Sequence, residues 1–587
     1  MLEIGPFRLD EPARSLRIEE REIALQPRVF DLLSYLIHNR ERVVSKDELL
    51  DKLWPDVTVT DNSLQRAVSS LRTALRESGM QDAVKNFPRS GYRFCLDDTQ
   101  APLADAQIGE AATSGPLDQA RRMVDERRWH DAAEHFQAAD TATPLGAADL
   151  DLWAIALQCI GDPSAPLPVL KRAVAAFTEA GNFSNAAADA AIISNLHLER
   201  GETALSKGWL ARADDLASKG DARARGYVVW ARSRAAAFEG EPKVAETLAN
   251  EAYELGRQSG DLMVEALGLM FRGFYRLSLG DTRAGLADQD HAAAIALSTK
   301  IDPVIGNILY CNILWACRTF GDWSRANQWT IGYQEFSAAS GMEFSGSCQL
   351  HRAEVLGVQG SLEDAKAHIL DALSKLAQEA PWAVGDAQRV LGDILVAMGD
   401  NDEAMEAYDK SYTAGWNPEP GRAMLLLERG DTEGAYASLE RGLLGQSWWT
   451  LQRQGMLLAH LALVAAAAGK NERAKALIED LACQEQRWPM PSIRALTNEA
   501  SALLARQSGD LQGALRHIHL ARQLWTSIDS RLNTARLRLL VAETQCELGD
   551  RTGAETELRT VAPAVELLGS RKLSQRYAEL KQRLAAN

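Results

Sequence analysis

Eleven glycines at almost constant spacing constrain the fold of this chain more than any other feature of its sequence. Nine of the ten intervals between them are 39 to 41 residues long, and the interval from Gly399 to Gly430 is 31 residues. Chance does not space one residue type so evenly, so this part of the chain is expected to be a repeat array. The glycines are Gly161, Gly201, Gly240, Gly280, Gly321, Gly360, Gly399, Gly430, Gly469, Gly509 and Gly549.

An alanine follows most of these glycines five residues later, as Ala245 follows Gly240. We interpret each glycine as the left-handed end of a first helix and each alanine as the small residue that lets a second helix pack closely. Arg128 and Ala133 are expected to be a first copy that lacks the glycine. The further alanines are Ala326, Ala365, Ala404, Ala435, Ala474, Ala514 and Ala554.

The period, the Gly-Asp or Gly-Asn turn and the small residue resemble those of tetratricopeptide repeats with lengthened helices. The resemblance implies about twelve helix pairs over residues 117–587, stacked into a right-handed superhelix with a concave inner surface. The expected fold class is therefore mainly α. It consists of an N-terminal α+β domain followed by an α-helical solenoid.

A helix and a hairpin are predicted between Thr60 and Phe94. Leu64, Val68, Leu71 and Leu75 form one apolar stripe at helical spacing, and the opposite face carries Asn62, Arg66, Ser69 and Thr73. Two short strands, Ala83 to Phe87 and Tyr92 to Phe94, follow on either side of the turn at Pro88 to Gly91. Polar side chains on a helix beside a hairpin with Arg89 at its tip suit a DNA groove, because they can donate to phosphates and base edges.

The charge distribution supports this interpretation. The chain has a formal net charge of −16, which as a whole disfavours nucleic-acid binding. Residues 1–97, however, hold 15 Lys and Arg against 16 Asp and Glu, and residues 98–587 hold 49 against 64. Within residues 62–94 there are six basic residues and two acidic ones. The basic charge is thus concentrated at the predicted DNA-reading surface.

About the first 97 residues resemble the winged-helix effector domain of OmpR/PhoB-type response regulators. The residues that carry the resemblance are Trp54-Pro55, Val59 to Asp61, the Val68, Leu71-Arg72 and Leu75 spine, and Gly91-Tyr92-Arg93-Phe94. The resemblance implies a recognition helix in the major groove, a wing at the minor groove, and binding to direct repeats. It also implies a contact of the loop at Asp56 to Thr58 with RNA polymerase. Ser69, Ser70 and Thr73 stand where other members look basic, which leaves the operator sequence open.

Ten residues are the expected DNA contacts. Arg66, Ser69, Ser70 and Thr73 would meet bases or nearby phosphates. Asn62, Ser63, Arg72, Lys85, Arg89 and Arg93 would mainly hold phosphates or the wing.

Upstream of this helix, Ile4 to Leu9, Ser15 to Ile18 and Glu22 to Leu25 are expected to form an antiparallel sheet. A helix should begin at Pro27, and a second should run from the Ser45 cap to Trp54. Residues 98–116 are rich in Ala, Gly, Ser, Thr and Pro, so we expect a flexible linker there.

From about Asp386 onward the chain resembles the C-terminal repeat region of large LuxR- and MalT-type regulators. The resemblance rests on Gly415-Trp416-Asn417-Pro418-Glu419-Pro420-Gly421 and the helices that follow. Two prolines must break helix continuity, so a bend or groove is expected at this motif. No Gly-x-x-x-x-Gly-Lys-Ser/Thr sequence occurs, which argues against an ATP-driven switch. The chain begins directly at the winged helix, so no receiver domain is expected.

The sequence contains no recognisable motif of a catalytic site or of a metal site, and no cofactor is expected. His130 and His135, and His517 and His519, lack neighbouring ligands of metal-site form, so packing or surface roles are favoured. Trp448 and Trp449 are adjacent, so both cannot face one core. One of these two, or Trp416, is a candidate anchor for a ligand or partner.

Seven widely spaced cysteines, no export signal and no apolar run of membrane length predict a cytoplasmic protein with reduced thiols. The expected function is a sequence-specific DNA-binding transcriptional regulator without enzyme activity. Its solenoid would sense a signal, bind a partner, mask the DNA-reading face with its negative charge, or form a homodimer. The alternative is an interaction scaffold whose winged helix contacts protein instead of specific DNA.

Overall fold

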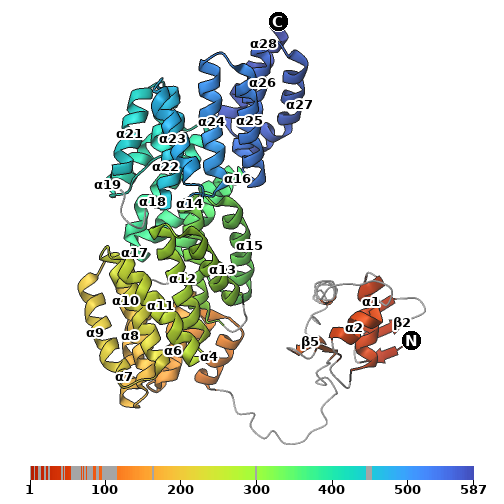
Figure 1. Ribbon diagram of the computed structural model, residues 1–587. Helices are drawn as coiled ribbons and strands as arrows, with labels where there is room; N and C mark the ends of the chain where they lie inside the picture. Colours follow the sequence, from red (N-terminus) through yellow and green to blue (C-terminus); the bar gives the residue numbers. More distant parts are fainter. Residues whose placement is uncertain are drawn as a thin grey trace, which may run out of the picture. The chain divides into compact units, whose positions relative to one another are not determined.

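The computed structural model divides the chain into two compact units, Met1–Ala112 and Thr113–Asn587 (Figure 1). In the second unit it describes residues 115–586 apart from 162–163, 298–300 and 445–451. In the first unit it describes residues 2–4, 7–10, 15–18, 21–23, 25, 27–40, 44, 46–53, 68, 71, 75, 83–87 and 91–94. Residues 98–114 of the predicted linker 98–116 lie outside the described residues, and a helix begins at Pro116.

The first unit contains an antiparallel sheet of β1 Leu2–Ile4, β2 Phe7–Asp10, β3 Ser15–Ile18 and β4 Arg21–Ile23, in that order. The expectation of one strand over Ile4 to Leu9 was wrong, because this stretch contains the end of β1 and the start of β2. Gly5-Pro6 separates the two strands in sequence, and such a dipeptide favours a turn. Leu2 pairs with Leu9, and Leu9 pairs with Leu16 across the sheet.

Two helices, α1 Pro27–His38 and α2 Lys46–Leu53, pack with the sheet and with the hairpin of β5 Val84–Phe87 and β6 Gly91–Phe94. The predicted helix at Pro27 is confirmed, and its apolar face is buried, because all five residues of that face are at most 4% exposed. These residues are Val29, Leu32, Leu33, Leu36 and Ile37. The Tyr35 hydroxyl donates to Glu48 Oε1 at 2.8 Å and ties α1 to α2.

The second unit is a solenoid of helix pairs, and its first half runs from α4 to α15 (Figure 1). These helices are α4 Pro116–Asp125, α5 Trp129–Ala142, α6 Ala147–Cys159, α7 Pro166–Glu179, α8 Phe183–Glu199, α9 Thr203–Ala217, α10 Ala222–Phe238, α11 Pro242–Ser259, α12 Leu262–Leu279, α13 Thr282–Ala296, α14 Pro303–Phe320 and α15 Trp323–Ser340.

The second half continues from α16 to the C-terminus. It comprises α16 Gly346–Gln359, α17 Leu362–Glu379, the short 3-10 helix η2 Pro381–Ala383, α18 Val384–Met398, α19 Asn401–Thr413, α20 Gly421–Glu428, α21 Thr432–Leu444, α22 Gln454–Ala467, α23 Asn471–Cys483, α24 Pro491–Gln507, α25 Leu511–Ser527, α26 Arg531–Glu547, α27 Arg551–Leu568 and α28 Arg571–Ala586.

The glycine repeat is confirmed as the turn between the two helices of each pair. All eleven glycines have positive φ, from 71° at Gly469 to 97° at Gly399. The eight alanines that follow them are 0% exposed, as close helix packing requires. In several copies the aspartate after the glycine caps the second helix: Asp510 accepts from Gly513 N at 2.7 Å, and Asp550 accepts from Gly553 N at 2.9 Å.

Two details of the repeat differ from expectation or refine it. The first, glycine-free copy is displaced by one residue: Arg127 is the left-handed residue (φ 59°), and Ala132 is the fully buried alanine. The short interval before Gly430 reflects α20, which has eight residues. Pro418 and Pro420 both precede α20, which begins only at Gly421, and the predicted break in helix continuity is confirmed.

Successive turns of the superhelix touch each other. Ser492 Oγ donates to Gly321 O at 2.7 Å, Ser530 Oγ to Val358 O at 3.3 Å, and Ser570 Oγ to Ala397 O at 2.6 Å. These pairs are 171, 172 and 173 residues apart, so one turn of this part contains a little over four repeats. Each serine precedes or begins a first helix and binds the end of a first helix in the preceding turn.

Candidate nucleic-acid interface and solenoid interior

Three of the four residues of the predicted apolar stripe are buried, and the fourth, Leu64, lies outside the described residues. Val68 is 3% exposed and Leu71 and Leu75 are fully buried, and all three belong to the core that also contains Leu33 and Phe94. These three side chains therefore hold this stretch against the core, and the outward polar face stays a prediction.

Most of the predicted DNA contacts lie outside the described residues, so their roles stay predictions. These are Asn62, Ser63, Arg66, Ser69, Ser70, Arg72, Thr73 and Arg89. The same holds for the predicted polymerase contact at Asp56 to Thr58.

The wing is described by its backbone, and its register pairs two basic residues. Lys85 lies opposite Arg93, between the pairs Val84 with Phe94 and Asn86 with Tyr92. Because residues alternate between faces, Lys85 and Arg93 share the face opposite to that of buried Val84 and Phe94. The strands of the wing therefore carry two basic residues at paired positions.

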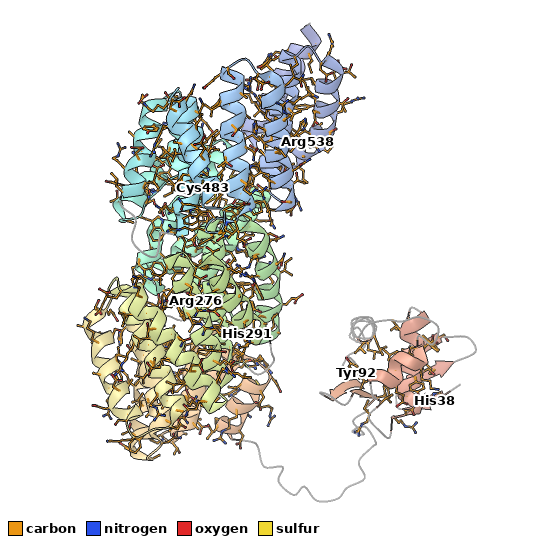
Figure 2. The ribbon with its side chains drawn as sticks, in the orientation of Figure 1. His38, Tyr92, Arg276, His291, Cys483 and Arg538 are labelled. Atoms are coloured by element: carbon orange, nitrogen blue, oxygen red, sulfur yellow. The ribbon has the colours of Figure 1, made fainter. Side chains whose placement is uncertain are left out.

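The wing is joined to the body of the domain through Tyr92, which is 5% exposed (Figure 2). Its N–H donates to Val44 O, and Val44 N donates to Tyr92 O, both at 2.9 Å. This bridge fixes the position of β6 relative to the segment between α1 and α2.

Two half-open cavities are lined by residues that the structure describes in the solenoid. Cavity 1 has a volume of about 270 Å³ and is lined by α6 to α18. Its walls combine apolar and aromatic side chains with amides and a carboxylate, among them Asn195, Glu199, Asn307, Trp315 and Trp382. Trp382 Nε1 donates to Glu199 Oε2 at 3.1 Å although the residues are 183 positions apart, which marks the closure of one superhelical turn.

Cavity 2 has a volume of about 500 Å³ and is lined by α14 to α28. It includes Pro420 and Gly421 of the proline motif, so this motif forms part of a cavity wall. Arg453 binds the carbonyls of Asn417 and Glu419, the former at 3.3 Å. Burial and nearby Arg389 lower the pKa of Arg453 to about 10.

A buried ion cluster of Arg318, Glu354, Asp386 and Arg389 lines cavity 2, and its Asp386 also lines cavity 1. Arg318 Nη2 lies 3.1 Å from Asp386 Oδ2, and Arg389 Nη2 lies 2.8 Å from Asp386 Oδ1. Arg389 Nη1 also lies 2.9 Å from Glu354 Oε1. Burial acts against ionisation, but Arg389, Arg318 and Arg453 hold the pKa of Asp386 below its usual range.

Two groups beside the cluster have shifted pKa values. Burial raises the pKa of Asp393 to about 6, although Arg389 lies 2.7 Å from its Oδ2. Burial and Arg318 lower the pKa of His351. The neutral His351 ring accepts from Arg318 Nη1 at Nδ1, at 2.5 Å.

Sequence reasoning missed the ion cluster. A signal exists, because Arg318, Glu354 and Arg389 are separated by 36 and 35 residues, close to one repeat. This spacing places charges on neighbouring first helices. Charged residues are more often solvated, however, so the spacing alone does not distinguish a buried ion cluster from solvated surface charges.

The structure describes only one of the three tryptophans that were predicted as candidate anchors. Trp448 and Trp449 lie outside the described residues. Trp416 is 8% exposed and packs against Gly385, which leaves little of its ring for a partner. Two of the four histidines have a polar neighbour in the structure: His130 lies 3.1 Å from Glu343, and His517 lies 3.0 Å from Asn498.

Within the described ranges, no group of three or more His, Cys, Asp or Glu side chains could hold a metal ion. None of the helices described is both long and apolar enough to cross a membrane.

The family model described as "Transcriptional regulatory protein, C terminal" matches residues 20–94. The uncharacterized transcriptional regulatory protein YvcP of Bacillus subtilis is 32% identical over 95 residues, which cover 16% of this chain and 40% of that protein. The phosphate regulon transcriptional regulatory protein PhoB of Rhizobium meliloti is 33% identical over 93 residues, 16% and 41% of the two chains. The chain thus spans less than half the length of either relative. Residues 20–94 form a winged-helix domain of the OmpR/PhoB type.

Among solved structures, the crystal structure of the APC/C hetero-tetramer Cut9-Hcn1 covers 80% of this chain and 93% of its own, at 14% identity and a TM-score of 0.38. A TM-score this low carries no argument about the repeats. The tetratricopeptide-like character rests on the helix pairs, the left-handed glycines and the buried alanines.

Proposed function

We propose that this protein is a sequence-specific DNA-binding transcriptional regulator, with the winged helix as its output and the helical solenoid as its input. The observation that carries the proposal is the family match over residues 20–94, together with the buried stripe of Val68, Leu71 and Leu75. A helix anchored along one face presents its other face to a groove.

Within this proposal, Arg66, Ser69, Ser70 and Thr73 contact bases or nearby phosphates. Asn62, Ser63, Arg72, Lys85, Arg89 and Arg93 hold phosphates or the wing. The register of the wing, which places Lys85 opposite Arg93, supports a phosphate contact there, because it brings two basic positions together. The loop at Asp56 to Thr58 contacts RNA polymerase.

The solenoid would receive a signal, bind a partner or form a homodimer in the cytoplasm. The two cavities and the buried ion cluster support a sensory role, since a concave interior with a few convergent polar groups is the usual form of a ligand site. No catalytic activity is part of the proposal.

The test is recovery of genomic DNA by the full-length protein and by two double variants. Arg66→Ala with Arg89→Ala removes two proposed contacts, whereas Arg516→Ala with Arg559→Ala makes the same charge change on α25 and α27. We expect a discrete set of sites that the first variant loses and the second keeps. Each lost phosphate contact should also lower the slope of log affinity against log salt by about one.

Equal recovery by the wild type and the Arg66, Arg89 variant would overturn sequence-specific binding by this surface. The same experiment with residues 1–97 then separates two explanations. Recovery only by the short fragment would show that the solenoid masks the DNA-reading face. No recovery by either would favour the scaffold function.

A further inference from the structure

Cavity 2 lies where two successive turns of the superhelix meet. Helices α16 and α18 of the earlier turn and α22, α24, α26 and α28 of the later turn each contribute an apolar side chain to its wall. These side chains are Val358, Ile394, Leu463, Leu496, Leu532 and Leu573. The volume of about 500 Å³ is in the range of sites for small organic molecules. A molecule bound there would touch both turns.

The charged side chains of this wall balance each other. Five are basic and five are acidic, so the wall carries no net formal charge. The ion cluster supplies four of the ten, and its Arg389 also holds Asp393. Arg453 binds two backbone carbonyl oxygens.

The other four charged side chains of the wall form two further ion pairs. Arg536 Nη2 lies 2.8 Å from Glu499 Oε2, and Lys572 binds Glu428. Each charge on the wall of cavity 2 thus has a partner within the chain. A charged ligand would have to compete with these contacts or remain uncompensated in a poorly solvated site, and both are costly. The wall therefore favours an uncharged ligand.

His460 offers such a ligand one polar contact. Its Nδ1 lies 2.8 Å from the carbonyl oxygen of Met456, which can only accept, so Nδ1 carries the proton. Burial lowers the pKa of His460, which keeps the ring neutral. Nε2 is then an acceptor, and none of the described residues donates to it. Since His460 lines cavity 2, a ligand that donates a hydrogen bond suits this site.

Two tryptophans on the same wall favour an aromatic ligand. Trp323 and Trp525 both line cavity 2. The Trp525 indole N–H donates to Glu499 Oε1 at 2.8 Å, which fixes the orientation of that ring. Aromatic rings pack well against one another in stacked or edge-to-face arrangements. An aromatic ring that carries a hydroxyl group combines this packing with the donor that His460 lacks.

We propose that cavity 2 binds an uncharged phenol whose hydroxyl group donates to His460 Nε2 and whose apolar body packs against the side chains of both turns. The bound phenol would join α16 and α18 to the later turn. Its role as the signal of the input domain rests on the proposed function, whereas the ligand class rests on the wall of the cavity.

The test is isothermal titration calorimetry of the full-length protein at neutral pH. The probes are phenol, 2-naphthol and 4-benzylphenol, which increase in size. Their methyl ethers are matched controls that cannot donate, and 2-naphthoate is a charged control. We expect 2-naphthol and 4-benzylphenol to bind at one site per chain, each more tightly than its ether, and 2-naphthoate to bind least.

Two substitutions of His460 test the hydrogen bond. His460→Leu should lower the affinity for the phenols by roughly threefold to tenfold, the value of one hydrogen bond, and leave the affinity for the ethers unchanged. His460→Gln keeps an acceptor and should retain part of the preference. The phenol-to-ether affinity ratio is the deciding quantity, because partial unfolding would weaken both ligands alike.

A pair of tryptophan substitutions tests the location. Leu463→Trp, three residues after His460 on α22, should fill the cavity and abolish binding of phenols and ethers. Leu520→Trp is the matched control, because Leu520 is 48% exposed on α25 and is not part of the wall. Circular dichroism checks that both variants fold.

Three results would overturn the proposal: no binding of any of the three phenols, full binding by folded Leu463→Trp, or the same phenol-to-ether ratio in the wild type and His460→Leu. The calorimetry contains no DNA, so its failure leaves the proposed function untouched. Recovery of genomic DNA without a phenol tests that function alone. Recovery that saturating 4-benzylphenol does not change would overturn the role of the phenol as signal.

Discussion

Asp386 shows how the solenoid uses charge in its interior. It is 3% exposed, and two arginines hold it, one from α14 and one from α18. The same arrangement recurs at Asp288, which lies 2.6 Å from Arg272 and 2.8 Å from Arg276. Buried pairs of this kind need every partner in place, because removing one charge leaves the other uncompensated in a poorly solvated site.

Asp386→Asn should therefore destabilise the solenoid by about 3 to 5 kcal/mol, since Arg318 and Arg389 lose a shared carboxylate while the side-chain volume hardly changes. Thermal or denaturant unfolding of both proteins measures this difference. Asp402→Asn is the matched control, because Asp402 pairs with Arg429 at 2.7 Å on a fully exposed surface. That change should have little effect.

The difference between the wild type and Asp386→Asn should depend on pH. The folded protein holds the pKa of Asp386 below its unfolded value, so the stabilisation is complete above about pH 4 and is lost as the pH falls below it. A difference that grows on acidification would contradict the ion-pair assignment.

The roles of residues that recur at a fixed spacing along the chain were predictable. The roles of residues that depend on partners far away in the sequence were not. Gly240 and Ala245 have a fixed spacing that one helix pair dictates. Val68, Leu71 and Leu75 follow the helical period. Arg272 and Asp288 gave no sequence signal, because their ion pair depends on which faces of α12 and α13 meet.

At the scale of elements, the turn between paired helices is set by backbone conformation. Arg127 shows the limit of the glycine pattern: its left-handed conformation (φ 59°) is not visible in the sequence, so the first repeat was displaced by one residue. Recognition of the winged helix likewise rested on short elements in the right order. The described strands β5 and β6 follow that order, whereas the outward face of the recognition helix stays a prediction.

Gly430 isolates the conformational cost of this turn. Its φ is 83°, and a Cβ there would meet no heavy atom within 4 Å, so Gly430→Ala should cost about 1 to 2 kcal/mol through backbone strain alone. Gly430→Asn should cost less, because asparagine tolerates this conformation. Gly208→Ala should have the opposite sign, a gain of about 0.5 to 1 kcal/mol, since Gly208 lies inside α9 with open space around it. Chemical denaturation of the three variants measures these changes in the free energy of unfolding. Equal effects of alanine at Gly430 and at Gly208 would exclude backbone strain as the cause.

At the scale of the whole repeat domain, contacts between successive superhelical turns distinguish it from a linear array. In a linear solenoid each repeat contacts only its neighbours, and stability is a sum of local terms. Here Ser492, Ser530 and Ser570 bind carbonyls 171 to 173 residues earlier. The repeat length predicted the stack, but the number of repeats per turn depends on small rotations between pairs, which the sequence does not display.

Removing these three hydroxyls should loosen one turn from the next. With a net value of roughly 1 kcal/mol for each hydrogen bond, the triple variant Ser492→Ala, Ser530→Ala, Ser570→Ala should lose about 3 kcal/mol. Hydrogen exchange should rise at the ends of α14, α16 and α18, which the serines cover, although these helices carry no substitution. Ser218→Ala, Ser374→Ala, Ser508→Ala is the matched control, because those hydroxyls bind only carbonyls of their own helices. Faster exchange confined to α24, α26 and α28 would mean that the turns fold independently. Faster exchange in all six helices would show that the two turns form one cooperative unit. A change in the packing of α14 against α16 could then reach the C-terminal helices.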